Sequence, residues 1–111
     1  MEEMLDPDYK FQSQEDLDDA LIYAAQIRDK VTLIRLISIG ADVQARCSEA
    51  LFEFLLGGDL GTAKYLISLG AKPEDISGEE MLFLMENARV KKSKLISFFL
   101  DFGFDVGSLI L

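Results

Sequence analysis

Apolar residues along this chain recur at intervals of three and four, the spacing that places side chains on one face of an α-helix. Leu60, Ala63, Leu66 and Ile67 form one such face. No stretch alternates apolar and polar residues in the manner of a half-buried strand. The pattern therefore predicts an all-α fold, with helices near residues 14–27, 30–39, 48–56, 60–69, 78–88 and 94–102.

Residues suited to helix ends flank several of these segments. Asp29 and Asp59 each precede an apolar face and are expected to accept hydrogen bonds from free backbone N–H groups as N-caps. Ser77 and Glu80 have the spacing of a capping box, and a weaker version at 13–16 precedes the first helix. Glycine follows an apolar run at positions 40, 70 and 103, where a left-handed residue commonly ends a helix.

The chain contains an internal repeat with a period of 30 residues. Residues 20–41 match residues 50–71 without a gap at nine of 22 positions. A weaker third copy, from Glu79 to Asp105, carries about three extra residues, which we place within 87–94. Repetition at this length indicates helical units that stack on one another. In the first copy, the repeated residues are Ala20, Leu21, Asp29, Thr32, Leu36, Ile37, Ser38, Gly40 and Ala41.

Residues 58–71, GDLGTAKYLISLGA, resemble the second half of an ankyrin repeat, with a glycine and polar cap, an amphipathic helix and a closing turn. Residues 40–43, Gly-Ala-Asp-Val, match the family's Gly-Ala-Asp turn, and residues 103–106 keep most of it. The resemblance implies three stacked helix–turn–helix repeats that form a short solenoid. The repeats would span 14–43, 44–74 and 75–107 within a domain of residues 13–111, after an acidic tail over 1–12.

The chain also departs from the family pattern. The Thr-Pro-Leu-His opening is replaced by residues 18–21, Asp-Asp-Ala-Leu, and by similarly altered segments in the other copies. The period of 30 is shorter than the family's usual spacing of about 33. In this respect the chain resembles the short-period ankyrin variant of large DNA viruses and of bacteria that live inside eukaryotic cells. A regular β-hairpin finger is not expected, because the threonine and histidine at its base are missing.

The resemblance implies a module that occupies or bridges a partner protein through a concave strip of inner helices and connecting loops. On this sequence the strip would carry Tyr23, Gln26, Gln44, Arg46, Phe52, Glu53, Leu56, Glu74, Asp75, Phe83 and Glu86. Phe52 and Phe83 fall at matching positions of the second and third copies, and aromatic residues are good interface anchors. Two placements are open for each ring: packed in the core, or facing a partner.

The net charge is −9, and most of it lies at one end. Residues 1–19 hold eight acids against Lys10, whereas residues 20–111 hold twelve acids and ten bases. This asymmetry raises an alternative function: a small acidic inhibitor, of viral or phage type, that blocks a nucleic-acid-binding protein through residues 1–19. A solubilising role for residues 1–12 is a further alternative.

Several features of the sequence bear on where in the cell the protein is expected to be. No apolar run approaches the roughly 20 residues of a membrane span, and the start of the chain lacks a secretory signal. The single cysteine, Cys47, is expected to be a small buried or half-buried residue in a reducing compartment. We therefore expect an intracellular, cytoplasmic protein, including the cytosol of an infected host, with no membrane partner. The apolar end Leu109, Ile110 and Leu111 either folds back on the third repeat or supports weak self-association.

The sequence offers little for catalysis. It contains no histidine, and its adjacent acid pairs (18–19, 74–75 and 79–80) lie near helix starts, where the helix dipole favours carboxylates. We therefore expect no enzyme activity, cofactor or metal site. The basic cluster of Arg89, Lys91, Lys92 and Lys94 has no interleaved aromatics, so it is interpreted as a solvated turn rather than a nucleic-acid site. A dock for an acidic partner is the alternative interpretation.

Overall fold

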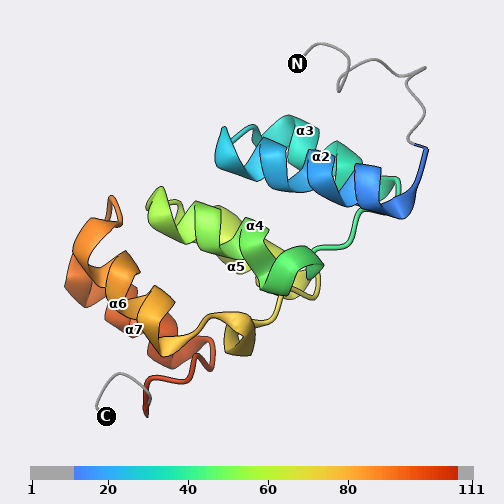
Figure 1. Ribbon diagram of the computed structural model, residues 1–111. Coiled ribbons are helices and arrows are strands. Elements are labelled where there is room, and N and C mark those ends of the chain that lie inside the picture. Colours follow the sequence, from blue (N-terminus) through green and yellow to red (C-terminus); the bar gives the residue numbers. More distant parts are fainter. Residues whose placement is uncertain (1–11, 108–111) are drawn as a thin grey trace.

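The computed structural model describes residues 12–107, apart from the side chain of Cys47 (Figure 1). Within this range the chain forms six α-helices, one short 3-10 helix and no strand, so the all-α prediction is confirmed there. Residues 1–11, which make up nearly all of the expected acidic tail, and the apolar end from Leu109 to Leu111 lie outside the described residues. In chain order the elements are α2 (Gln14–Gln26), α3 (Lys30–Ser38), α4 (Ala45–Leu56), α5 (Leu60–Ser68), η1 (Pro73–Asp75), α6 (Gly78–Asn87) and α7 (Lys92–Asp101).

Every N-cap predicted from the sequence accepts the hydrogen bond expected of it. The side-chain oxygens of four residues accept from the backbone N–H three positions later, each at 3.1 Å; the residues are Ser13, Asp29, Asp59 and Ser77. Glu80 completes the capping box, because its Oε1 accepts from the Ser77 backbone N–H at 3.0 Å. These bonds fix the starts of four helices locally, within one turn of chain.

Two helices begin earlier than predicted. Helix α4 starts at Ala45 rather than near residue 48, and α7 starts at Lys92 rather than near 94. Their N-cap residues, Gln44 and Lys91, make no side-chain cap bond, so the sequence carried no signal for these starts. Helix η1, a single 3-10 turn that begins at a proline, was also not predicted.

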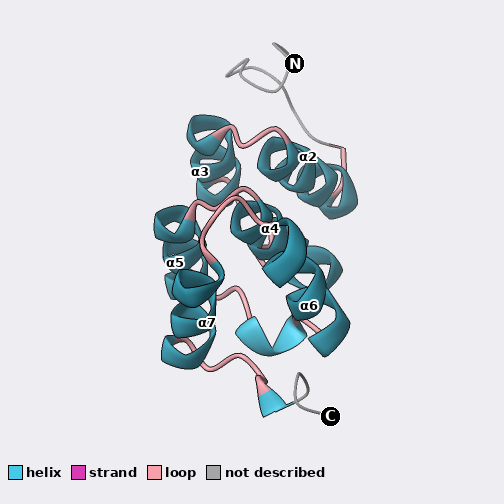
Figure 2. Ribbon diagram, turned by 90° about the vertical axis from the view of Figure 1, so that its left-hand side faces the viewer, coloured by secondary structure: helices cyan, strands magenta, loops and turns pink. Residues whose placement is uncertain are grey.

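The helices form two layers. Helices α2, α4 and α6 lie in one layer, and α3, α5 and α7 lie in the other (Figure 2). Helix α2 packs against α3 and α4, helix α4 packs against α5 and α6, and α6 packs against α7. The molecule is accordingly elongated, with principal extents of 48 × 21 × 20 Å.

The sequence repeat has a counterpart in the hydrogen bonds. Gln14 Nε2 donates to the Gly40 carbonyl at 3.0 Å, and 30 residues later Gln44 Nε2 donates to the Gly70 carbonyl at 2.9 Å. Both glycines have positive φ, +111° and +117°, and follow the last turns of α3 and α5. After each glycine, an alanine N–H returns to the helix: Ala41 bonds the Leu36 carbonyl and Ala71 the Leu66 carbonyl, both at 3.0 Å.

One continuous core runs between the layers and along the stack. Its largest fully buried side chains are Phe54 and Phe99. At the carboxyl end, the ring of Phe104 lies 4.8 Å from that of Phe99 and 5.9 Å from that of Phe98, measured between centroids. Most of the remaining core residues are leucine, isoleucine and alanine, together with Val43 and Met81, so each helical pair buries its apolar face against its neighbour. Among the described residues, no helix is long and apolar enough to cross a bilayer.

Candidate protein-binding surface

The predicted partner-binding residues gather on the layer of α2, α4 and α6 and its connecting segments. Tyr23 and Gln26 lie on α2, Arg46, Phe52, Glu53 and Leu56 on α4, and Phe83 and Glu86 on α6. Gln44 is the N-cap of α4, and Glu74 and Asp75 belong to η1. Helix α4 packs against both α2 and α6, so the residues on these three helices can share one surface, here called the α2/α4/α6 face.

An aromatic pair joins α4 to α6 on this face. The rings of Phe52 and Phe83 are stacked, with centroids 6.1 Å apart and an interplanar angle of 28°. Phe83 is 49% exposed, whereas Phe52 is half-buried and packs against the core. Phe52 therefore packs partly in the core and is partly accessible to a partner, and Phe83 is the more accessible of the two rings.

The expected equivalence of Phe52 and Phe83 is not supported by their burial. Leu51 and Met81 are both fully buried, as are Phe54 and Leu84, which aligns α4 with α6 at an offset of 30. Phe52 then corresponds to Leu82, and Phe83 corresponds to Glu53. The two rings stack as diagonal neighbours on adjacent helices, which the alignment of the copies did not predict.

Carboxylates surround the aromatic pair. Glu49 precedes Phe52 by three residues, and Glu79 and Glu86 flank Phe83 at four residues before and three after. At these spacings the side chains share a helix face with the ring. Glu86 was predicted from the sequence, whereas Glu49 and Glu79 were not, although the same three- and four-residue spacing from the rings could have identified them.

Glu53 lies between these acids in an unfavourable electrostatic setting. Burial raises the pKa of its carboxyl group, and the nearby carboxylate of Glu49 raises it further, against an opposing influence of Arg28. A half-buried carboxylate beside a like charge favours a cation in contact with it. The positive charge of Arg28 only partly offsets the effects of burial and of Glu49, so the pKa of Glu53 stays raised.

Some of the predicted residues also hold the fold together. Arg46 forms an ion pair with Asp19, and Gln26 Nε2 donates to Glu49 Oε2 at 3.4 Å, so both connect α4 with α2. Asp75 accepts a hydrogen bond from Ser48 Oγ at 2.9 Å. Gln44, as described above, holds the turn at Gly70. Exposed Glu74, by contrast, belongs to η1 rather than to the helices of the face.

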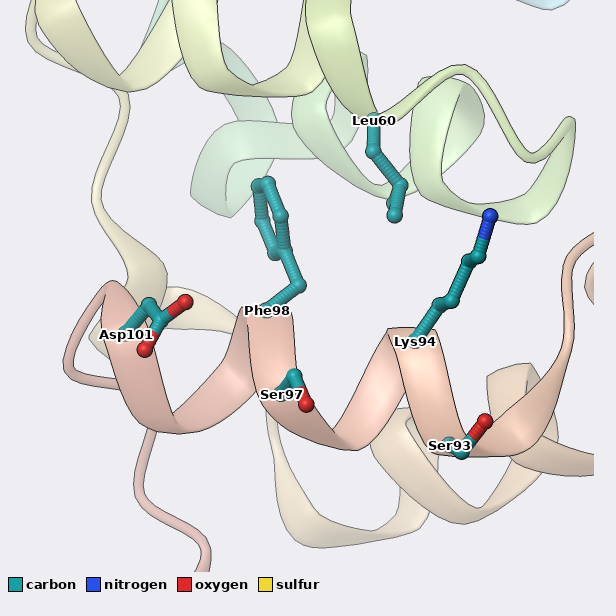
Figure 3. Close-up of a pocket in the computed structure, with 6 residues that line it drawn as sticks. All are labelled: Leu60, Ser93, Lys94, Ser97, Phe98 and Asp101. Atoms are coloured by element: carbon teal, nitrogen blue, oxygen red, sulfur yellow. The ribbon is translucent and has the colours of Figure 1, made fainter.

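A separate groove lies on the other layer, between α5 and α7 (Figure 3). It has a volume of about 390 Å³ and is open to solvent. Its lining residues are Leu60, Ser93, Lys94, Ser97, Phe98 and Asp101. Of the basic cluster that the sequence singled out, Lys94 reaches this groove. The groove holds one cation and one anion side chain above an apolar floor, and no residue expected on the partner-binding strip lines it.

The described residues offer no evident metal site. No group of three or more Cys, Asp or Glu side chains there is arranged to hold a metal ion, and the chain has no histidine. Comparisons with protein-family models, with curated proteins and with solved structures gave no match. The argument for function therefore depends on the surface itself.

Proposed function

We propose that this protein is a protein-binding module built from three ankyrin-like helix–turn–helix repeats, at residues 14–43, 44–74 and 75–107. The hydrogen bonds that recur at an offset of 30 support this proposal for the first two units. The third is supported by Gly103, with a φ of +78°, and by the bond from the Phe104 N–H to the Phe99 carbonyl at 3.0 Å.

The module binds its partner through the α2/α4/α6 face, and the half-exposed ring of Phe83 stacked on Phe52 is the observation that carries this assignment. An aromatic ring loses little side-chain entropy when it is buried at an interface, and such rings often contribute about 2 kcal/mol or more to binding. Exposed Leu82 and Tyr23 extend the apolar area along the same layer. Binding by occupation of a surface needs no catalytic group, in keeping with the expectation of no enzyme activity.

A peptide-display selection on the full chain tests this function. Random peptides are selected on the unaltered protein and then measured against two variants, Phe83→Ala and Tyr65→Ala. Tyr65 is a matched control, because it is an exposed aromatic residue on α5, in the opposite layer. We expect the selected peptides to lose most of their affinity for Phe83→Ala and to keep it for Tyr65→Ala.

The opposite pattern, or selected peptides that ignore both substitutions, would place binding elsewhere on the molecule. Thermal unfolding of both variants provides the folding control. Phe83 is half-exposed, so its truncation is expected to lower the free energy of unfolding by only about 1 kcal/mol, mostly from loss of the ring stack.

A further inference from the structure

The two helical layers carry opposite charge. Helices α3, α5 and α7 hold five bases and one acid, Asp101. Helices α2, α4 and α6 hold nine acids and one base, Arg46. The nine acids are Glu15, Asp16, Asp18, Asp19, Glu49, Glu53, Glu79, Glu80 and Glu86. Of the two layers seen in Figure 2, one therefore has helices rich in acids, here called the acidic layer, and the other has helices rich in bases, here called the basic layer, although Asp29 and Asp59 cap α3 and α5.

Within the acidic layer, the carboxylates follow the repeat. Asp19, Glu49 and Glu79 are separated by 30 residues each and form a row across α2, α4 and α6. The row lies one helical turn before the aromatic pair, on the side of the helix starts. Arg46, the single base of these helices, is engaged with Asp19 at the far end of the row from Phe83. Helix α6 holds no base and α4 holds only Arg46, so the cation that acts on Glu53 comes from outside these helices: it is Arg28, in the segment between α2 and α3.

The stability of the helices does not explain why acids occupy all of these positions. Glu53 and Glu86 lie in the last turns of α4 and α6, where the helix dipole disfavours negative charge, and neither last turn contains a base. Glu53 also lies close to Glu49, and both of these acids flank Phe52. A surface that keeps carboxylates in unfavourable positions around an exposed aromatic ring fits a ligand that brings positive charge.

We propose that the α2/α4/α6 face binds a basic protein segment, in which lysine or arginine residues flank an aliphatic or aromatic anchor. This inference rests on the proposed function and names the chemistry of the partner. The anchor packs on the Phe52–Phe83 pair, and the cationic groups reach Glu49, Glu53, Glu79 and Glu86. Lysine and arginine suit both parts of the surface, because their aliphatic stems cover apolar rings while their charged ends meet carboxylates. A neutral or acidic segment would instead leave these carboxylates desolvated and unpaired.

Three synthetic peptides serve as probes. The first places leucines at helical spacing among lysines, the second replaces every lysine with glutamate, and the third replaces every leucine with serine. Binding to the full chain is followed by fluorescence anisotropy at low and at physiological ionic strength. We expect the lysine–leucine peptide to bind, the glutamate peptide not to bind, and the lysine–serine peptide to bind weakly and only at low salt.

Protein variants locate the binding. Phe83→Ala is expected to weaken the lysine–leucine peptide by about thirtyfold or more, the loss typical of an interface anchor. The double variant Glu79→Gln/Glu86→Gln should weaken it by about three- to tenfold, since each exposed ion pair contributes modestly. The control Glu15→Gln/Asp16→Asn removes the same charge from the first turn of α2, and its affinity should change by less than about twofold.

Two further experiments test the proposal, and each has an outcome that would overturn it. Deletion of residues 1–12 should leave the affinity for the lysine–leucine peptide within about threefold; a complete loss would assign the binding to those residues. Sedimentation of the chain alone should show monomers at low salt; salt-sensitive assembly would mean that the basic layer of a second copy is the occupant of this face.

The display selection separates a failure of this inference from a failure of the proposed function. Peptides that depend on Phe83 but contain no excess of lysine and arginine would overturn the basic-partner inference and leave the binding face in place. Peptides that do not depend on Phe83 at all would overturn the proposed function. Peptides that depend on Phe83 and are enriched in basic residues would support both.

Discussion

At the scale of single residues, several polar side chains in this protein connect segments that are distant in the sequence. Ser48 is fully buried near the start of α4, where its Oγ donates to Asp75 Oδ2 at 2.9 Å and accepts from the Lys72 N–H at 3.0 Å. Asp18 performs the same function 30 residues earlier, where it accepts from the Asp42 N–H at 2.8 Å. A short polar residue at this position thus holds the segments that follow α3 and α5.

The substitution Ser48→Ala is expected to lower the free energy of unfolding by about 1–3 kcal/mol, because it leaves the Lys72 N–H and the Asp75 carboxylate without this partner. Urea denaturation measures the change. Ser68→Ala is the control: its hydroxyl is exposed and bonds only the Tyr65 carbonyl of its own helix, so its removal should change stability by less than about 0.5 kcal/mol. Equal effects of the two substitutions would contradict the structural role given to Ser48.

The pH dependence of stability should differ in sign between two acids. The folded-state pKa of Glu53 is raised, chiefly by burial, so its ionisation opposes folding. The variant Glu53→Gln is therefore expected to be more stable than the unaltered chain at neutral pH. This advantage should disappear as the pH falls below the ordinary glutamate pKa, where Glu53 is protonated in both states. A variant that is less stable at neutral pH would contradict the prediction.

Asp59 provides the opposite case. Burial raises its pKa, but the hydrogen bonds and charge of Lys30, 2.7 Å away, and the bonds from Thr62 outweigh burial and leave the pKa lowered. Its contribution to stability is present above the ordinary aspartate pKa and is lost as the pH falls through the folded-state pKa. Asp59→Asn should therefore be less stable than the unaltered chain at neutral pH, and the deficit should shrink in acid. Urea denaturation across a pH series checks both variants.

At the scale of elements, the connection between α4 and α5 depends on a close approach to the segment between α6 and α7. The Arg89 N–H donates to the Leu56 carbonyl at 3.1 Å. Gly58, two residues later, has a φ of +80°, and a Cβ built there would lie 2.6 Å from the Arg89 carbonyl oxygen. At the corresponding place after α2, Arg28 adopts a φ of +55°, so the turn itself tolerates a side chain. The glycine is needed because another backbone lies against it.

Gly58→Ala is accordingly expected to cost more stability than Gly40→Ala. Both substitutions place alanine in the left-handed region, at about 1–2 kcal/mol each. Only Gly58→Ala also pushes against a backbone, whereas the nearest atom to a Cβ at Gly40 is a Leu17 methyl carbon at 3.9 Å. Thermal and urea unfolding of the two variants give the comparison, and similar losses would show that the approach of Arg89 is unimportant.

At the scale of the whole molecule, each helical pair depends on its neighbours to bury its apolar side chains. Phe54 and Leu55 of α4 are fully buried in a structure where α4 contacts α2, α5 and α6. If the three helical pairs are repeats as proposed, stability generally needs at least three of them. The distribution of charge between the layers is also a property of the whole molecule. Residues 20–111 are nearly balanced in charge along the sequence, and within this range the acids of α4 and α6 are separated from the bases of α3, α5 and α7 because alternate helices enter alternate layers.

Removal of α6 and α7 should therefore affect the remaining helices as well. A chain that ends at residue 74 is expected to lose helical circular dichroism beyond the share of the deleted residues and to unfold without a cooperative transition. The full chain, measured in parallel, should unfold cooperatively. A cooperative transition in the shortened chain would indicate that the first two pairs form a stable unit.

The helices and their starts were largely accessible from the sequence, because a cap is a contact within one turn of chain. Asp29, Asp59 and the Ser77–Glu80 box were predicted from spacing alone and make the expected bonds. Where no cap bond exists, at Gln44 and Lys91, the predicted starts were wrong by two or three residues. The apolar spacing was enough for the all-α class and for the face of α5, where Ala63 and Leu66 are buried and Leu60 and Ile67 are half-buried.

The features that depend on contacts between helices were determined only by the tertiary structure. Only the packing of α4 against α6 sets Phe52 against Phe83 as diagonal neighbours, and it leaves Phe83 half-exposed while Phe52 lies half-buried. The four acids of α2 are neighbours in the sequence, but only the alternation of helices between layers brings the five acids of α4 and α6 to the same side. The sequence determined local structure, since helix periodicity and caps act over three or four residues. The surface was determined by side chains about 30 residues apart, whose meeting depends on how the helical pairs pack.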